Sequence, residues 1–151
     1  MKNEPFIIEQ VYKTSLDRVW KAITSIEEMK QWYFDISEFN PEPGFEFQFM
    51  AGPDEKRQYH HLCKVIEVIP MRKLVYSWQY EGYEGNSLVT FELWPQGELT
   101  RLKLIHEGIE TFPAGDPDFS KDSFAEGWNW IIGTVLKMYL EKTVNQTSKS
   151  H

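Results

Sequence analysis

Histidines are the residues of this sequence best suited to proton transfer near neutral pH, and three of them lie in segments that alternate like strands: His60, His61 and His106. His106 falls on the same alternating face as Leu102 and Leu104, so we expect it to point into the interior. There it could orient a ligand oxygen or act as an acid or base, or it could be a core histidine bonded to a neighbour. A catalytic histidine needs a second positioned group, and because the sequence offers no convincing one, we assign no catalytic residue.

The other candidates for site chemistry cluster around residue 60. His60 and His61 are neighbours on a predicted strand and therefore point to opposite faces, which argues against a shared metal site. Cys63 shares its face with His61 and Tyr59, so it could form a nucleophilic pair with the histidine or serve as a small apolar core residue. We favour the core thiol and expect no metal ion and no cofactor.

Aromatic residues are abundant, at 15% of the chain. Rings of this kind fill cores, but they also line cavities for apolar ligands, and Tyr and Trp add polar ends that can hold such a ligand in place. Both readings stay open for each residue. As a group, they and their apolar neighbours predict a ligand pocket lined by Phe47, Phe49, Tyr59, His61, Tyr76, Trp78, Phe91, Leu104, His106, Trp128, Ile132 and Val135.

A second aromatic group follows the helical segments near residue 30. It could form a lid over the mouth of the pocket, a surface for a partner, or plain core. We predict a lid or pocket mouth formed by Trp32, Tyr33, Phe34 and Phe39.

Alternation of apolar and polar residues predicts the strands that would carry these side chains. One covered face and one wet face are typical of an antiparallel sheet. The slip in alternation near Val65 and Ile66 suggests a bulge. The predicted strands cover residues 6–13, 45–50, 57–69, 74–80, 87–94 and 99–106.

Helical spacing predicts two short helices after the first strand and a long one near the end. Thr14 or Ser15 could cap the first helix, and Thr14 with Asp17 resembles a capping box. Ser25 with Glu28 forms a second and better capping box before residues 26–32. The long helix should cover 121–142, with an apolar stripe formed by Trp128, Ile131, Ile132, Val135, Leu136, Tyr139 and Leu140. Trp130 and Met138 lie off this stripe and, if exposed, would suit a weak homodimer or partner contact.

Chain length and net charge limit the possible domain organisation and the possible partners. With 151 residues we expect one domain over 1–142 and a polar, disordered tail over 143–151. A net charge of −7 argues against nucleic acid as a partner. No stretch approaches the ~20 apolar residues of a membrane span, and no apolar signal segment is present, so we expect no membrane insertion and a cytoplasmic location. The single Cys63 excludes an internal disulfide.

Several runs, in order, give the chain a family resemblance: SLDRVWKAIT (15–24), MKQWY (29–33), KLVYSW (73–78), VTFEL (89–93), TRLKLIHEG (100–108), GW (127–128) and LKMYLE (136–141). Over roughly residues 6–142 the chain resembles the activator of heat-shock-protein-90 ATPase homologue-like domain family of the START-like (SRPBCC) superfamily. The resemblance implies an α+β helix-grip fold, in which a curved six-stranded antiparallel sheet surrounds a long C-terminal helix and two short helices follow strand one.

Across that superfamily the resemblance implies lipids, sterols, polyketides or other apolar molecules held between sheet and helix. Our leading hypothesis is therefore the binding of a small apolar or aromatic ligand. One alternative is a stress-response co-chaperone. The eukaryotic co-chaperone engages its chaperone through a separate N-terminal domain, which we do not expect here because the sequence starts at the family's first strand. The other alternative is an enzyme of the polyketide cyclase or aromatase type.

Overall fold

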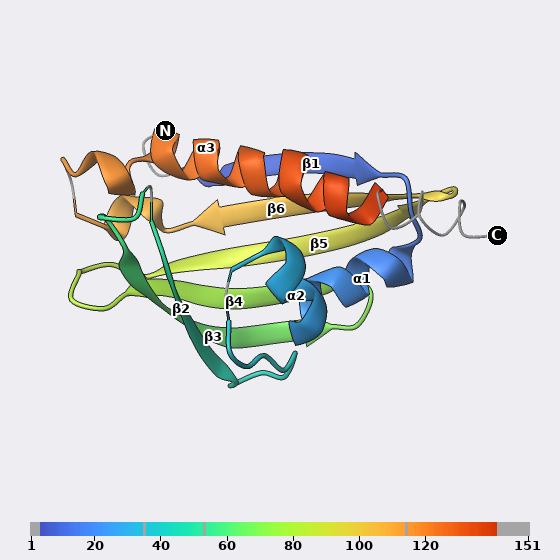
Figure 1. The fold of residues 1–151 in the computed structure, drawn as a ribbon, viewed down its shortest axis with the longest axis horizontal. Coiled ribbons are helices and arrows are strands. Elements are labelled where there is room, and N and C mark those ends of the chain that lie inside the picture. The colour runs from blue at the N-terminus through green and yellow to red at the C-terminus, as the bar shows by residue number, and fades with distance from the viewer. Residues whose placement is uncertain (1–3, 35, 53, 114, 142–151) are drawn as a thin grey trace.

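A six-stranded antiparallel sheet and one long helix form the two layers of the computed structural model, which describes residues 4–34, 36–52, 54–113 and 115–141 (Figure 1). The strands lie in the order β1-β6-β5-β4-β3-β2, so the first strand pairs with the last. This architecture confirms the predicted α+β helix-grip fold. The strands are β1 (Phe6–Tyr12), β2 (Glu46–Ala51), β3 (Tyr59–Ile69), β4 (Lys73–Tyr80), β5 (Ser87–Gln96) and β6 (Leu99–Glu107).

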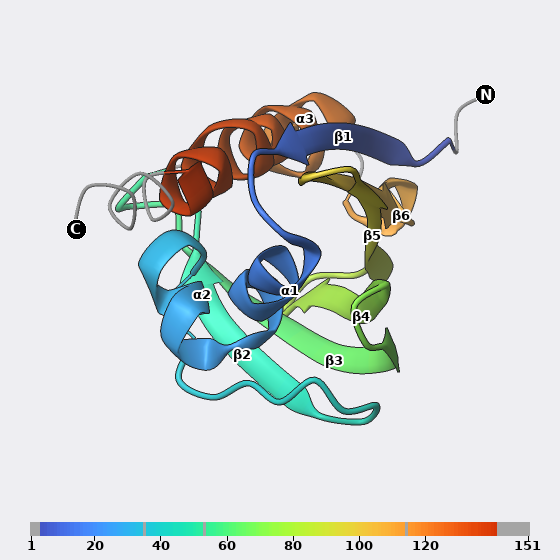
Figure 2. The same ribbon diagram turned by 90° about the vertical axis from the view of Figure 1, so that its right-hand side faces the viewer.

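The helices connect and cover the concave side of this sheet. Seen end-on, the sheet curls around α3 and the two short helices (Figure 2). The predicted tail over 143–151 lies outside the described residues. The helical segments are α1 (Leu16–Thr24), α2 (Ile26–Trp32), the short turns η1 (Ile109–Thr111) and η2 (Pro117–Phe119), α3 (Lys121–Trp130), and a π-helical segment η3 (Ile131–Val135) that continues as α-helix over 136–141.

Strand β3 contains an irregularity that the sequence predicted, and strand β5 is longer than predicted. The register of β3 against β4 shifts between Val65 and Glu67, which confirms the predicted bulge and turns Ile66 toward solvent. Strand β5 continues two residues beyond its predicted end, because Pro95 still lies opposite Thr100 of β6.

The predicted capping boxes were wrong. Ser15 and Ser25 occupy the N-cap positions of α1 and α2, but neither side chain caps its helix. Glu28 instead accepts hydrogen bonds from Arg18 Nη1 at 2.5 Å and from the Tyr139 hydroxyl at 2.9 Å. This carboxylate therefore joins both short helices to the far end of the long one.

Apolar side chains fill the middle of the space between sheet and helix. Tyr76, Phe91 and Leu104 from three adjacent strands, and Ile132 and Leu136 from the long helix, are all almost completely buried. The predicted pocket between sheet and helix is therefore closed at its centre, and the cavity has to lie toward an end.

A buried tyrosine supports the π-helical segment of the long helix. A π turn holds one residue more than an α turn and so changes which side chains face the sheet. The Tyr12 hydroxyl on β1, wholly buried, donates a hydrogen bond of 2.7 Å to the carbonyl oxygen of Ile132. The first strand thereby fixes the helix where its geometry changes.

We expect Tyr12→Phe to lower the free energy of unfolding by about 1–3 kcal/mol, because the Ile132 carbonyl would remain buried without this donor. Urea denaturation of the variant and of Tyr83→Phe, which alters a half-exposed tyrosine, provides the comparison. Equal stability of the two variants would contradict this role for Tyr12.

Candidate functional site

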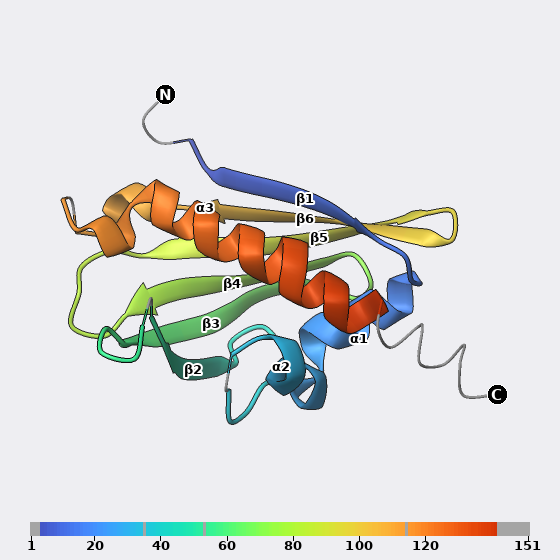
Figure 3. The same cartoon turned by 45° about the horizontal axis from the view of Figure 1, so that its top comes forward.

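A cavity of about 450 Å³ lies where the first turns of α3 cross the ends of β2, β3 and β4. The start of α3 and the turn between β2 and β3 lie at the same end of the molecule (Figures 1 and 3). The lining includes exposed residues of α3, so the cavity reaches the surface beside this helix. It is formed by Phe34, Ala51, Gly52, Tyr59, His61, Trp78, Tyr80, Asp118, Phe119, Ser123, Phe124, Glu126, Gly127, Trp128, Trp130 and Ile131.

The structure divides the predicted pocket residues into two groups. Four line the cavity, namely Tyr59, His61, Trp78 and Trp128. The others lie in the core or against it, because the middle of the sheet packs directly on the helix: Phe47, Phe49, Tyr76, Phe91, Leu104, His106, Ile132 and Val135.

The predicted lid residues are similarly divided, and only Phe34 lines the cavity. Trp32 is buried and donates its indole N–H to the carbonyl oxygen of Ala22 at 2.8 Å. Phe39 is buried too, with its ring edge-on to Phe47. The Tyr33 hydroxyl lies 2.5 Å from that of Tyr76 on β4. Trp32 and Phe39 are thus core residues, while Phe34 forms part of the wall.

Sequence reasoning missed most of the wall contributed by α3 and the loop before it. Tyr80 continues the alternating face of Trp78, so that pattern could have identified it as lining. Residues 124, 127, 128 and 131 share one helical face, but Gly127 hid the periodicity by having no side chain. Phe119 lies in a segment that looked like a polar loop, and nothing local indicated its place.

His61 forms part of the aromatic wall. Its ring stacks on Phe49 with centroids 4.4 Å apart and meets Tyr80 and Trp78 edge-on. Its Nδ1 lies 2.9 Å from the Tyr59 carbonyl oxygen, to which it donates in the neutral form. Burial among these rings lowers the pKa of His61 to about 4, so the imidazole is uncharged at neutral pH.

His106 connects the helix to the sheet without lining the cavity. Trp128 donates its indole N–H to His106 Nδ1 at 3.0 Å, so the ring proton lies on Nε2, which donates to Ser87 Oγ at 2.8 Å. Ser87 in turn donates to the Trp78 carbonyl oxygen at 2.8 Å. Burial lowers the pKa of His106 to about 3. Both ring nitrogens are occupied within the fold, which makes His106 a structural histidine.

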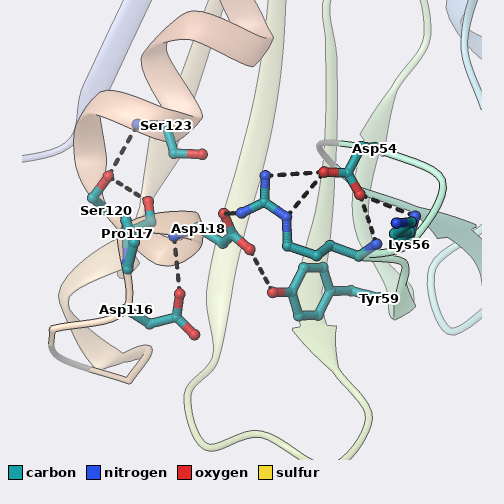
Figure 4. A network of polar contacts seen from close by, with 9 residues as sticks. Asp54, Lys56, Tyr59, Asp116, Pro117, Asp118, Ser120 and Ser123 are labelled. Atoms are coloured by element: carbon teal, nitrogen blue, oxygen red, sulfur yellow. Dashed lines mark hydrogen bonds and ion pairs between the residues drawn. The ribbon is translucent and has the colours of Figure 1, made fainter.

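Asp118 ties the loop before α3 to the turn between β2 and β3 (Figure 4). It accepts the Tyr59 hydroxyl at 2.6 Å and Arg57 Nη1 at 2.9 Å, and Arg57 also pairs with Asp54 at 3.1 Å. The Asp118 backbone N–H donates to Asp116 Oδ1 at 3.0 Å, which fixes the η2 turn. The hydrogen bond to Asp118 raises the pKa of Tyr59 above its usual range. Polar and charged side chains thus form one side of the cavity.

Comparison with known proteins assigns the fold to a family. The model of the Activator of Hsp90 ATPase homolog 1-like protein family matches residues 13–141. The chain belongs to this family. This confirms the resemblance inferred from the sequence runs. None of the curated proteins matches the chain.

Solved structures of similar fold include three that illustrate its range. Mll3558 from Rhizobium loti is 23% identical with a TM-score of 0.78, over 91% of this chain and 96% of that one. CV1439 from Chromobacterium violaceum is 16% identical with a TM-score of 0.75, over 93% and 99%. DynU16, from the dynemicin biosynthetic locus, is 22% identical with a TM-score of 0.74, over 92% of this chain. The match covers 48% of DynU16, so this chain spans about half of its length.

Two expectations about partners can be compared with the described part of the chain. Its residues include no group of three or more His, Cys, Asp or Glu side chains placed to hold a metal ion. Among the helices described, none is long and apolar enough to cross a membrane.

Trp130 and Met138 are exposed, at 63% and 66%, and Trp130 also borders the cavity.

The two buried histidines should make stability depend on pH. Their folded-state pKa values, about 4 for His61 and about 3 for His106, lie below the ordinary value of 6.5, so below pH 6.5 the unfolded chain binds protons that the folded chain does not. The free energy of unfolding should therefore be highest above pH 6.5 and fall toward pH 5 by up to ~1.4 kcal/mol per pH unit for each histidine.

Urea denaturation at pH 7.5, 6.5 and 5.5 measures this slope. We expect His61→Gln to remove the contribution of His61 to the pH dependence of stability and to leave the contribution of His106. A wild-type stability that does not change over this range would contradict the buried, neutral state of both rings.

Proposed function

We propose that this protein binds a small, largely apolar molecule in the cavity beneath the first turns of α3. The observation that carries the proposal is the cavity itself, about 450 Å³ in volume and walled mainly by aromatic rings. Sites for small molecules commonly measure roughly 300–1,000 Å³ and combine apolar walls with a few polar groups. The location of DynU16 in a biosynthetic locus is consistent with a small-molecule role for this fold.

The protonation of the site favours binding over acid–base catalysis. A general acid or base works best when its pKa lies near the working pH. Burial lowers the pKa of His61 to about 4, whereas the pKa of Tyr80 is raised by burial and that of Tyr59 by its hydrogen bond to Asp118. These three cavity residues thus keep their neutral forms near pH 7. The cyclase or aromatase alternative would require a substrate that shifts the pKa values of these residues toward neutral pH.

A blocking variant can test the proposal, because the cavity has a glycine in its wall. A Cβ built at Gly127 would meet no atom within 4 Å, and a larger side chain there would extend into or across the cavity. Leucine also favours the helix over glycine, so Gly127→Leu should fold. Asn129→Leu adds the same side chain at an exposed position of α3 outside the lining and serves as the matched control.

The uncharged dye N-phenyl-1-naphthylamine, whose emission rises in apolar sites, is a suitable probe. We expect saturable binding to the wild type and to Asn129→Leu, and at least ~10-fold weaker binding to Gly127→Leu, since filling a site removes the contacts that bind the dye. Fatty acids, sterols and naphthalene compounds can then be ranked by displacement of the dye.

Absence of saturable binding to the wild type, or equal binding to both variants, would contradict the proposal. Stimulation of a cognate Hsp90-type ATPase by a protein that binds none of these compounds would instead support the co-chaperone alternative.

A further inference from the structure

The cavity contains a buried hydroxyl with a proton available for a ligand. Tyr80, at the end of β4, is only 6% exposed and lines the cavity. Its oxygen accepts the indole N–H of Trp78 at 2.8 Å. Among the residues that the structure describes, this is the only hydrogen bond of the Tyr80 hydroxyl, so its own O–H has no protein acceptor. A buried donor without an acceptor is unfavourable, and a ligand oxygen would relieve that cost.

The neighbouring cavity tyrosine differs in this respect. The Tyr59 hydroxyl donates its proton to Asp118 at 2.6 Å, so it can only accept a further hydrogen bond. The two phenols are therefore not equivalent. Tyr80 is a donor toward the cavity, and its oxygen is polarised by the Trp78 N–H, which makes its proton a better donor.

The charged side chains among the described lining residues are all acidic. Asp118 and Glu126 contribute carboxylates, and no Lys or Arg occurs among the residues that the structure places in the wall. Arg57 lies outside this wall and is already paired with Asp54 and Asp118. An anionic ligand would lose its hydration without gaining a cation as partner, which is costly in an apolar site.

The walls also favour a flat molecule. Trp78 and Trp128 present large rings with centroids 5.4 Å apart, and Phe34 stacks on Phe49 at an interplanar angle of 10°. Aromatic rings pack well against the faces and edges of other planar groups.

We infer that the cavity selects uncharged planar aromatic carbonyl compounds, whose carbonyl oxygen accepts the Tyr80 hydroxyl, over the corresponding aromatic carboxylates. This inference rests on the proposed function, since it specifies the ligand class of the same cavity. Tyr80 is the specificity-determining residue, and the absence of Lys and Arg from the described residues of the wall disfavours anions.

The dye 6-propionyl-2-dimethylaminonaphthalene tests the hydrogen bond directly, because it is an uncharged aromatic ketone whose emission moves to the red when its carbonyl accepts a hydrogen bond. We expect Tyr80→Phe to shift the emission of the bound dye to the blue and to weaken binding about 2- to 10-fold. Tyr59→Phe removes the hydroxyl of the other cavity tyrosine, whose proton is used by Asp118, and should give no blue shift. Equal shifts in both variants would overturn the role of Tyr80.

Displacement of the dye from the wild-type protein tests the selectivity without any variant, so it stands even if Tyr80→Phe folds poorly. We expect 2-acetonaphthone to displace it at a concentration at least ~10-fold lower than 2-naphthoate and below that of 2-ethylnaphthalene, which has no acceptor. Affinity for 2-ethylnaphthalene should not depend on the Tyr80 hydroxyl.

The outcomes separate the two proposals. If all three naphthalenes bind the wild type but the carboxylate competes as well as the ketone, the selectivity is wrong while the proposed binding function stands. If none of them binds, both proposals fail.

Discussion

A hydrogen-bonded chain across the two layers is the constraint on which the rest of the structure depends. It runs from the Trp128 indole through His106 and Ser87 to the backbone carbonyl of Trp78, and so joins α3 to β6, β5 and β4. Each polar atom in it is buried and bonded, which makes the arrangement specific as well as stable. Charging His106 would disrupt it, and burial opposes that by holding the pKa of His106 at about 3.

This series of hydrogen bonds also determines where the cavity lies. It fixes Trp128 and Trp78 on opposite layers, with their rings in the wall at one end of the sheet. Beyond them, Tyr76, Phe91 and Ile132 fill the space completely. On another side the cavity is bounded by Asp118 and Tyr59, which share a hydrogen bond, and by Phe119, whose ring packs against Tyr59.

The fold was predictable from the sequence because its elements are encoded locally. Alternation along each strand and helical spacing in the last helix specify which faces are covered. Even the bulge of β3 was visible as a slip in the alternation. The capping boxes failed for a tertiary reason. Glu28 reaches Arg18 and Tyr139, which come close only after the long helix has crossed the sheet. Sequence spacing carries no information about that contact.

The cavity was only partly predictable, because alternation shows that a side chain faces inward but not whether another side chain fills the space before it. Tyr76 and Trp78 share one alternating face of β4, yet Tyr76 is packed against its neighbours and Trp78 borders the cavity. The difference arises from the helix above them. Ile132 is completely buried against the sheet, whereas a Cβ at Gly127 in the cavity wall would meet no atom within 4 Å.

The residues that identify the family and those that line the cavity are largely different sets. Of the lining residues, only Trp78, Gly127 and Trp128 fall within the sequence runs that carry the resemblance. Those runs contain Trp78, His106 and Trp128 of the hydrogen-bonded network between helix and sheet. Tyr80, Asp118 and Phe119 lie outside them, although Tyr80 and Phe119 are also buried in the core. The sequence runs therefore predict the scaffold, whereas most of the residues that line the cavity become evident only in the folded structure.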